Sequence, residues 1–208
     1  MSSPVFFLGT PLHDARVHQA YLAGAMELSA ALPQQLILSE VTRPFLPVSR
    51  DVLTAQFLRS PATHFLCVDS DIGFRAADVQ RLLVAQKDFV SGIYATKDAE
   101  RRLTSPLSRR REGDLIEVNY AAAGFLLLTR ACVERMVQAH PELEYHTPDG
   151  RLWALWSPIF DVRPYGEDAS FSKRWRALGG QIWAHSGVVL EHHGDIAFLP
   201  KNLAGPRT

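Results

Sequence analysis

Residues 4–90 alternate between short apolar runs and longer amphipathic stretches, and this alternation restricts the fold more than any other feature. Such a pattern is typical of an α/β sheet in which helices cross over between strands. The apolar runs predict strands over residues 5–8, 35–41, 64–68 and 89–94. Apolar residues at helical spacing predict helices over residues 13–32, 49–59 and 76–86.

The second half of the chain has shorter periodic segments. We expect strands over residues 116–120, 125–129, 181–184 and 188–191, and helices over 130–139 and 168–178. Residues 96–114 and 141–165 lack a clear period and predict surface loops. A chain of 208 residues suffices for one α/β core. We therefore expect one domain over residues 1–199, followed by a flexible tail over 200–208.

Composition excludes several classes of protein. The 22 basic residues balance the 22 acidic ones, so any polyanionic partner must meet a local patch. A hydrophobic content of 47% excludes a disordered chain. Cys67 and Cys132 lie in apolar segments without metal-ligand spacing, which predicts buried, reduced thiols. The chain has neither a signal-peptide pattern nor the ~20 apolar residues that span a bilayer, so we expect a soluble, cytoplasmic protein.

Two aspartates, Asp69 and Asp71, follow directly after the apolar run of residues 64–68. Side chains at i and i+2 of an extended backbone point to one face, and ligands of open α/β sheets bind at the carboxyl ends of strands. Two carboxylates there repel each other unless a cation lies between them, and oxygen ligands favour Mg²⁺ or Mn²⁺. The alternative is that Asp69 bonds local amides while Asp71 begins a turn before Gly73.

Two further groups have both a functional and a structural interpretation. Glu167 and Asp168 begin a predicted helix, where they either cap its positive end or present a base to a cleft. His192 and His193 follow the last predicted strand, where they either complete an oxygen-rich metal site or lie at the surface. Signatures of phosphate-loop, dinucleotide-binding, serine-hydrolase and zinc-protease chemistry are absent from the sequence.

Taken in order, these segments resemble the GT-A glycosyltransferases, in particular the small family-2-like enzymes of bacteria and tailed phages. The resemblance covers nearly the whole chain. It is carried by Ser49-Arg50-Asp51 and by the runs at residues 63–74, 87–94, 123–128, 166–171, 178–183 and 190–194.

The resemblance implies a single Rossmann-like nucleotide-sugar domain with a mostly parallel central sheet flanked by helices. It makes Asp69, Ser70 and Asp71 the DxD motif, with Asp69, Asp71 and His192 as ligands of Mn²⁺ or Mg²⁺. Asp168, preceded by Glu167, fits the catalytic base of inverting members. Contacts to a nucleotide-sugar, a UDP-sugar being the expected donor, fall to Thr10, Pro11, Glu40, Arg50 and Gly124. The loop Ala122-Ala123-Gly124 departs from the usual pattern and leaves the donor sugar open.

The resemblance leaves two kinds of acceptor open, a glycan or lipid precursor and a hydroxymethylated pyrimidine in phage DNA. Trp153 and Trp156 offer flat faces to an acceptor, or else pack under their own loop. Arg109, Arg110 and Arg111 could contact DNA phosphates, although neighbouring acidic residues dilute their charge. Two other functions stay open. One is a haloacid-dehalogenase-like, Mg²⁺-dependent phosphatase, and the other is a non-catalytic module that binds a nucleotide-sugar or glycan.

Overall fold

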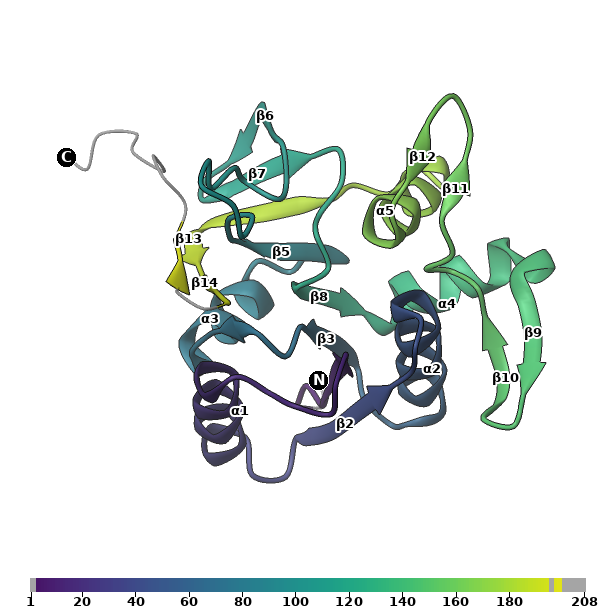
Figure 1. The fold of residues 1–208 in the computed structure, drawn as a ribbon, viewed down its shortest axis with the longest axis horizontal. Helices are drawn as coiled ribbons and strands as arrows, with labels where there is room; N and C mark the ends of the chain where they lie inside the picture. The colour runs from purple at the N-terminus through teal and green to yellow at the C-terminus, as the bar shows by residue number, and fades with distance from the viewer. Residues whose placement is uncertain (1–2, 195–196, 200–208) are drawn as a thin grey trace.

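An eight-stranded sheet in the order β2-β1-β3-β8-β5-β13-β7-β6 forms the centre of the molecule (Figure 1). The computed structural model describes residues 3–194 and 197–199, so the tail predicted over 200–208 lies outside the described residues. The strands of this sheet are β1 (Phe6–Leu12), β2 (Leu36–Thr42), β3 (His64–Val68), β5 (Phe89–Ile93), β6 (Leu107–Glu112), β7 (Leu115–Val118), β8 (Phe125–Thr129) and β13 (Trp183–Val189).

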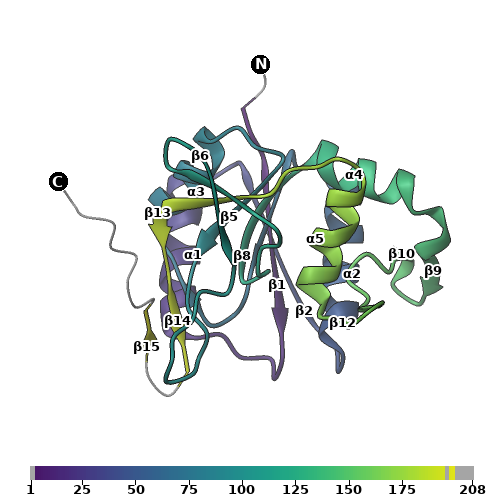
Figure 2. The same ribbon diagram turned by 90° about the horizontal axis from the view of Figure 1, so that it is seen from above.

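Helices cover both faces of the sheet (Figure 2). One face carries α1 (Gln19–Ala31) and α3 (Ala76–Val84), and the other carries α2 (Leu46–Arg59), α4 (Arg130–Ala139) and α5 (Glu167–Ala177). Successive residues of β1 alternate between the two layers, because side chains of a strand alternate between its faces. Phe7 packs in the core beneath α2, whereas Phe6 and Leu8 pack beneath α1 and α3.

Shorter elements complete the fold. The 3₁₀ turn η1 (Pro141–Leu143) follows α4. Two antiparallel hairpins lie before α5, and a small three-stranded sheet brings β14 against β4. These strands are β4 (Ile72–Gly73), β9 (Glu144–Thr147), β10 (Gly150–Trp153), β11 (Ile159–Phe160), β12 (Pro164–Tyr165), β14 (Glu191–His193) and β15 (Ala197–Phe198).

The sheet is mixed, so the prediction of a mostly parallel sheet is wrong. Only the pairs β1–β2, β1–β3 and β5–β13 are parallel. Strand β8 lies antiparallel between β3 and β5, and β7 pairs antiparallel with both β13 and β6. Apolar runs predict that a segment is a strand, but they carry no information about its direction.

The predicted elements are confirmed where apolar runs have sharp boundaries. The bounds of β3, β8 and α4 match the prediction. The first helix begins at Gln19 instead of residue 13, because Ala15 has a positive φ of 58° and the His18 ring accepts a bond from the Ala20 amide as an N-cap.

The two predicted loops are wrong in part. Residues 96–114 contain the edge strand β6, and residues 141–165 contain the hairpins β9–β10 and β11–β12. An edge strand with an exposed face tolerates a polar run, so β6 lacks the apolar pattern by which a strand is predicted. The strands predicted over 181–184 and 188–191 are instead the single strand β13, followed by β14.

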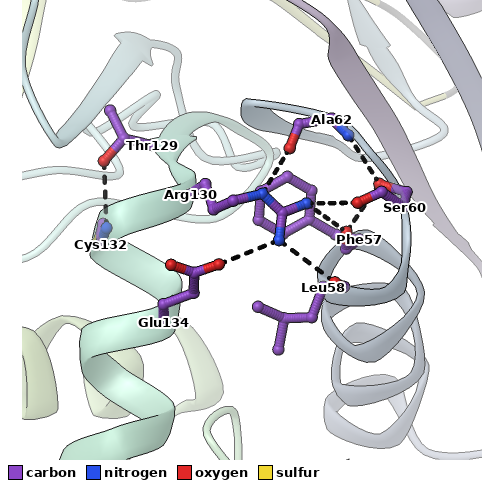
Figure 3. Close-up of polar contacts among 8 residues, drawn as sticks. All are labelled: Phe57, Leu58, Ser60, Ala62, Thr129, Arg130, Cys132 and Glu134. Carbon is purple, nitrogen blue, oxygen red and sulfur yellow. Dashed lines mark hydrogen bonds and ion pairs between the residues drawn. The ribbon is translucent and has the colours of Figure 1, made fainter.

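Arg130 joins α4 to the end of α2 (Figure 3). Its guanidinium donates to the carbonyl oxygens of Ala62 (2.8 Å), Ser60 (2.7 Å) and Phe57 (3.0 Å), and it lies 4.6 Å from the centre of the Phe57 ring. The last carbonyls of a helix lack partners within the helix and carry partial negative charge. The Arg130 cation satisfies them and thereby fixes the position of α2.

Both cysteines are buried and form no disulfide, as predicted. None of the described helices is long and apolar enough to cross a membrane.

Candidate functional site

The carboxyl ends of β1, β2 and β3 share one edge of the sheet, which lies at the bottom of Figure 2 together with the start of α5. A cleft of about 390 Å³ opens here, a size in the range of small-molecule sites. Its lining comes from the end of β1 and from the segments that follow these strands: Pro11, Leu12, His13, Arg43, Pro44, Leu46, Asp69, Ser70 and Asp71. The predicted Pro11, Asp69, Ser70 and Asp71 therefore lie together.

Asp69 is held by Arg50, which projects from α2. The Arg50 guanidinium donates to Asp69 Oδ1 at 2.8 Å and to Cys67 Sγ at 3.0 Å, and its side chain is only 2% exposed. Burial opposes the charged form of Arg50, but Asp69 outweighs burial and raises the pKa of Arg50. Because it is buried and paired in this way, Arg50 orients Asp69 and presents little surface to a ligand.

Asp71 lies between two basic side chains. Lys97 donates to Asp71 Oδ2, and Nε2 of His192 lies 3.5 Å from Asp71 Oδ1. Burial opposes ionisation of Asp71, but His192 and Lys97 outweigh burial and lower its pKa to about 2. Asp71 is therefore ionised at neutral pH.

The geometry of His192 bears on metal binding. Its Nδ1 donates to the carbonyl oxygen of Ala95 at 2.8 Å, so a neutral ring turns the lone pair of Nε2 toward Asp71 Oδ1. That oxygen is buried and makes no hydrogen bond to any described residue. Two acceptors facing each other need a proton or a cation between them. A proton on Nε2 makes the two groups an ion pair, and a metal ion bound by both atoms would take the place of that proton.

The complete predicted ligand set is not assembled. Among residues 3–194 and 197–199, no three His, Cys, Asp or Glu side chains are grouped so that they could hold one ion. Asp69 is paired with Arg50 and is not grouped with Asp71 and His192 around one possible ion. The ligand role of Asp69 stays a prediction.

Gly124 allows the backbone to approach both Asp69 and Tyr94. Its N–H donates to the Tyr94 hydroxyl at 2.7 Å, and its carbonyl accepts from the Asp69 amide at 3.0 Å. A Cβ at position 124 would lie 2.5 Å from the Tyr94 oxygen and 3.3 Å from Asp69 Oδ2. Only glycine fits here, because real Cβ contacts do not come so close.

Glu167 and Asp168 form the first turn of α5, after the N-cap Gly166. Oδ1 of Asp168 accepts from the Ala169 amide at 2.6 Å, which agrees with the structural interpretation of this acidic pair. Burial, followed by the charge of Glu167, raises the pKa of Asp168. Asp168 also lies within the electrostatic range of Arg50 and Asp69, so it belongs to the same edge as the cleft.

Two predicted donor contacts lie apart from the cleft. The Thr10 hydroxyl is fully buried and shares a 2.6 Å hydrogen bond with the Tyr21 hydroxyl. Glu40 lies opposite Thr10 on β2 with its side chain exposed, and it is outside the cleft lining.

The acceptor residues predicted from the sequence are elsewhere. Trp156 is fully buried, stacks on Phe171 with ring centres 4.0 Å apart and donates to Thr54, and Trp153 is 8% exposed. The interpretation of these two rings as an acceptor lid is therefore wrong, since both fill the core beneath their hairpin. Arg109, Arg110 and Arg111 lie in β6, at the opposite end of the strand order from β1–β3, and Arg110 pairs with Glu112 and Glu117.

Sequence reasoning missed Arg43, Tyr94 and Lys97. Arg43 follows the last residue of β2, so the rule that sites lie after strands would have found it. It forms a bidentate pair with Asp149 of the β9–β10 turn, at 2.7 and 2.8 Å. Lys97 lies in a segment without periodicity, and no local signal marks it.

The fold and this edge define a mixed, Rossmann-like α/β protein with a carboxylate-lined cleft. The chain is similar to A197 from STIV, with a TM-score of 0.60 and 16% identity over 98% of each chain, which shows a shared fold alone. No family model matches the sequence, and the comparison with curated proteins gives no match.

Two solved enzyme structures are weakly similar. UDP-glucose pyrophosphorylase complexed with UDP-glucose matches with a TM-score of 0.48 and 10% identity, over 87% of this chain and 90% of that one. A glycosyltransferase involved in the glycosylation of the major capsid of PBCV-1 matches with a TM-score of 0.38 and 11% identity, over 66% of each chain.

Proposed function

We propose that the chain is a metal-dependent glycosyltransferase that moves a sugar from a nucleotide-sugar, a UDP-sugar, to an acceptor hydroxyl. The observation that carries the proposal is the pair formed by Asp71 and His192. A buried carboxylate oxygen without a hydrogen bond faces a ring nitrogen at 3.5 Å, at the sheet edge where α/β folds bind ligands. An ion between Asp71 and His192 would give the Asp71 oxygen a partner. A nucleoside diphosphate in the adjacent cleft would explain why the pair lies at this edge of the sheet.

The cleft supports donor binding by its size and its charge. Arg43 lines it while paired with Asp149, and Lys97 is paired with Asp71 at its border, so a diphosphate in the cleft could draw on both cations. Phe45 and Leu46, exposed at the start of α2, offer apolar surface to a nucleobase. Both kinds of contact are what a nucleoside diphosphate requires.

Asp71 and His192 would hold Mn²⁺ or Mg²⁺, and such an ion stabilises negative charge on a departing diphosphate. Arg50 orients Asp69, and Gly124 lets the backbone pass close to that carboxylate and to Tyr94. Together these residues position the donor and its leaving group.

Asp168 is the proposed base. As the acceptor hydroxyl oxygen bonds to the anomeric carbon, the bond from that carbon to the diphosphate oxygen breaks and Asp168 takes the hydroxyl proton. This assignment corresponds to inversion at the anomeric carbon. Burial raises the pKa of Asp168, which makes it a stronger base than an exposed aspartate.

Ligand-induced thermal stabilisation tests the donor site. UDP-glucose at a hundred times its Kd should raise stability by about 2.7 kcal/mol, or the Tm by about 5–10 °C for a chain of this size, when Mn²⁺ is present. Asp71→Asn should abolish this rise, whereas Asp161→Asn, an exposed aspartate outside the cleft, should retain it. No rise with any of a panel of nucleotide-sugars would refute the proposal.

Release of UDP separates an enzyme from a binding module. The wild-type chain should release UDP from its donor in the presence of Mn²⁺, and Asp168→Asn should bind the donor without releasing UDP. Donor binding without UDP release in the wild type, across a panel of acceptors, would favour the non-catalytic module.

A further inference from the structure

A second pocket, of about 480 Å³, follows one face of α5. Gly166, Ala169, Lys173 and Arg176 line it at helical spacing, and β12 and the segment after β7 close it from the sides. The side chains that give the pocket its chemistry are Tyr120, Arg163, Tyr165, Lys173 and Arg176.

The pocket gathers positive charge. Arg163, Lys173 and Arg176 line it, and none of its lining residues is acidic. Lys173 pairs with Asp161 at 2.6 Å, but neither Arg163 nor Arg176 forms an ion pair with a described residue. The chain as a whole has no net charge, so this excess of cations is a local feature of the pocket. The excess of cations therefore points to an anion.

An aromatic ring lies among these cations. The Arg163 guanidinium lies 5.2 Å from the centre of the Tyr165 ring, and Lys173 Nζ lies 4.4 Å from the same centre. Tyr120 also lines the pocket. Tyrosine rings pack against the apolar faces of sugars, and arginine binds phosphate through paired N–H groups. The pocket thus has surfaces for a sugar and for its phosphate.

The position of the pocket connects it to Asp168. Its lining residues Gly166 and Ala169 flank Glu167 and Asp168, so the pocket begins at the turn that carries the proposed base. Figure 2 shows α5 starting at the sheet edge that bears the cleft and extending away from it. A molecule anchored along α5 would place a hydroxyl near Asp168.

We propose that this pocket binds the anionic group of the acceptor, a phosphate or diphosphate on the sugar that carries the accepting hydroxyl. This inference rests on the proposed function and names the substrate class of the same site. The volume suits one sugar phosphate. Binding of duplex DNA needs a row of cations along an extended surface instead, and Arg110 in β6 is already paired with glutamates.

The test compares two double variants. Arg163→Gln/Arg176→Gln removes both unpaired cations of the pocket, and Arg81→Gln/Arg151→Gln removes the same charge elsewhere. Titration calorimetry at fixed ionic strength should show glucose 6-phosphate binding to the wild type and to the control variant, and glucose binding to neither. The pocket variant should bind glucose 6-phosphate at least about tenfold more weakly, because it lacks two charge-assisted contacts.

Binding of UDP with Mn²⁺, measured on the same proteins, separates the two proposals. Glucose 6-phosphate binding that depends on Arg163 and Arg176, without UDP binding, would keep the anion pocket and overturn the glycosyltransferase. If the chain binds UDP, but all variants bind glucose 6-phosphate with the same affinity, the anion pocket is overturned and the glycosyltransferase proposal stands. Inorganic phosphate bound as tightly as glucose 6-phosphate would indicate a free-phosphate site and overturn the acceptor assignment. If a short DNA duplex is the one ligand whose binding depends on Arg163 and Arg176, the acceptor assignment is overturned in favour of nucleic acid.

Discussion

Asp51 is an ionisable residue inside the core. Its replacement tests how the burial of its carboxyl group changes the free energy of unfolding with pH. The side chain projects from α2 and is 1% exposed. Its carboxylate accepts from the Trp156 amide at 3.2 Å and from the Tyr145 hydroxyl at 3.0 Å. Burial raises the pKa of Asp51 from 3.8 to about 7, against the opposing effect of these hydrogen bonds.

The sign of the effect follows from proton binding. Between about pH 4 and pH 7 the folded chain holds a proton on Asp51 that the unfolded chain has released, so the free energy of unfolding falls as pH rises. The contribution is fully present below the unfolded pKa and is lost once the pH exceeds the folded pKa. The difference between the two pKa values corresponds to a loss of about 4 kcal/mol.

Asp51→Asn removes this titration while keeping the size of the side chain. The stability of Asp51→Asn relative to wild type should improve by about 4 kcal/mol between pH 4 and pH 8. Urea unfolding followed by tryptophan fluorescence measures this difference at each pH. His64 and His185, whose pKa values burial lowers, titrate in both proteins and cancel.

Asp14→Asn is the matched control, because Asp14 is exposed. Its stability relative to wild type should change little over the same range. A difference between Asp51→Asn and wild type that is constant from pH 4 to pH 8 would refute the argument, since it would mean that burial does not perturb this carboxyl group.

Three further predictions concern single contacts. Arg130→Met should lower the free energy of unfolding by about 2–4 kcal/mol in urea, since it leaves the carbonyls of Ser60 and Ala62, just after α2, without this donor, and an equal stability would contradict this. Gly124→Ala should lower sugar transfer at least about tenfold, because its Cβ would displace Tyr94 or Asp69 by more than close packing allows, and a wild-type rate would disprove it. Asp168→Asn should lower kcat about 10²–10⁴-fold with the donor Kd unchanged. In the wild type, kcat should rise with pH through a pKa above 3.8, and a flat profile would exclude Asp168 as the base.

Local sequence patterns predicted the elements whose borders are chemically sharp. The run His64–Val68 ends at two aspartates, and Phe125–Thr129 ends at a threonine that caps the following helix. Both borders were correct to the residue. Strand direction was not predictable in this way, because an apolar run has the same pattern when it is read in either direction.

The sequence predicted only part of the candidate site. Asp71 and His192 come together as expected, because β14, which carries His192, pairs antiparallel with β4, which begins directly after Asp71. Arg43 and Lys97 are separated from Asp71 along the chain, and only the fold brings them near it. The sequence left Trp156 open between an acceptor contact and packing under its own loop, because its segment has no period, and the structure shows the packing, with Phe171 and Thr54 enclosing it.

The place of β8 has a consequence for how the chain is made. Strand β3, which ends at Asp69, pairs on one side with β1 and on the other with residues 125–129. Until those residues have left the ribosome, β3 and β5 each lack their common neighbour, and their backbone groups have no partner on that side. The first half of the chain holds both aspartates, yet a fragment that stops before residue 125 exposes two apolar strand edges. We expect such a fragment to aggregate, so the site forms only after β8 has been synthesised.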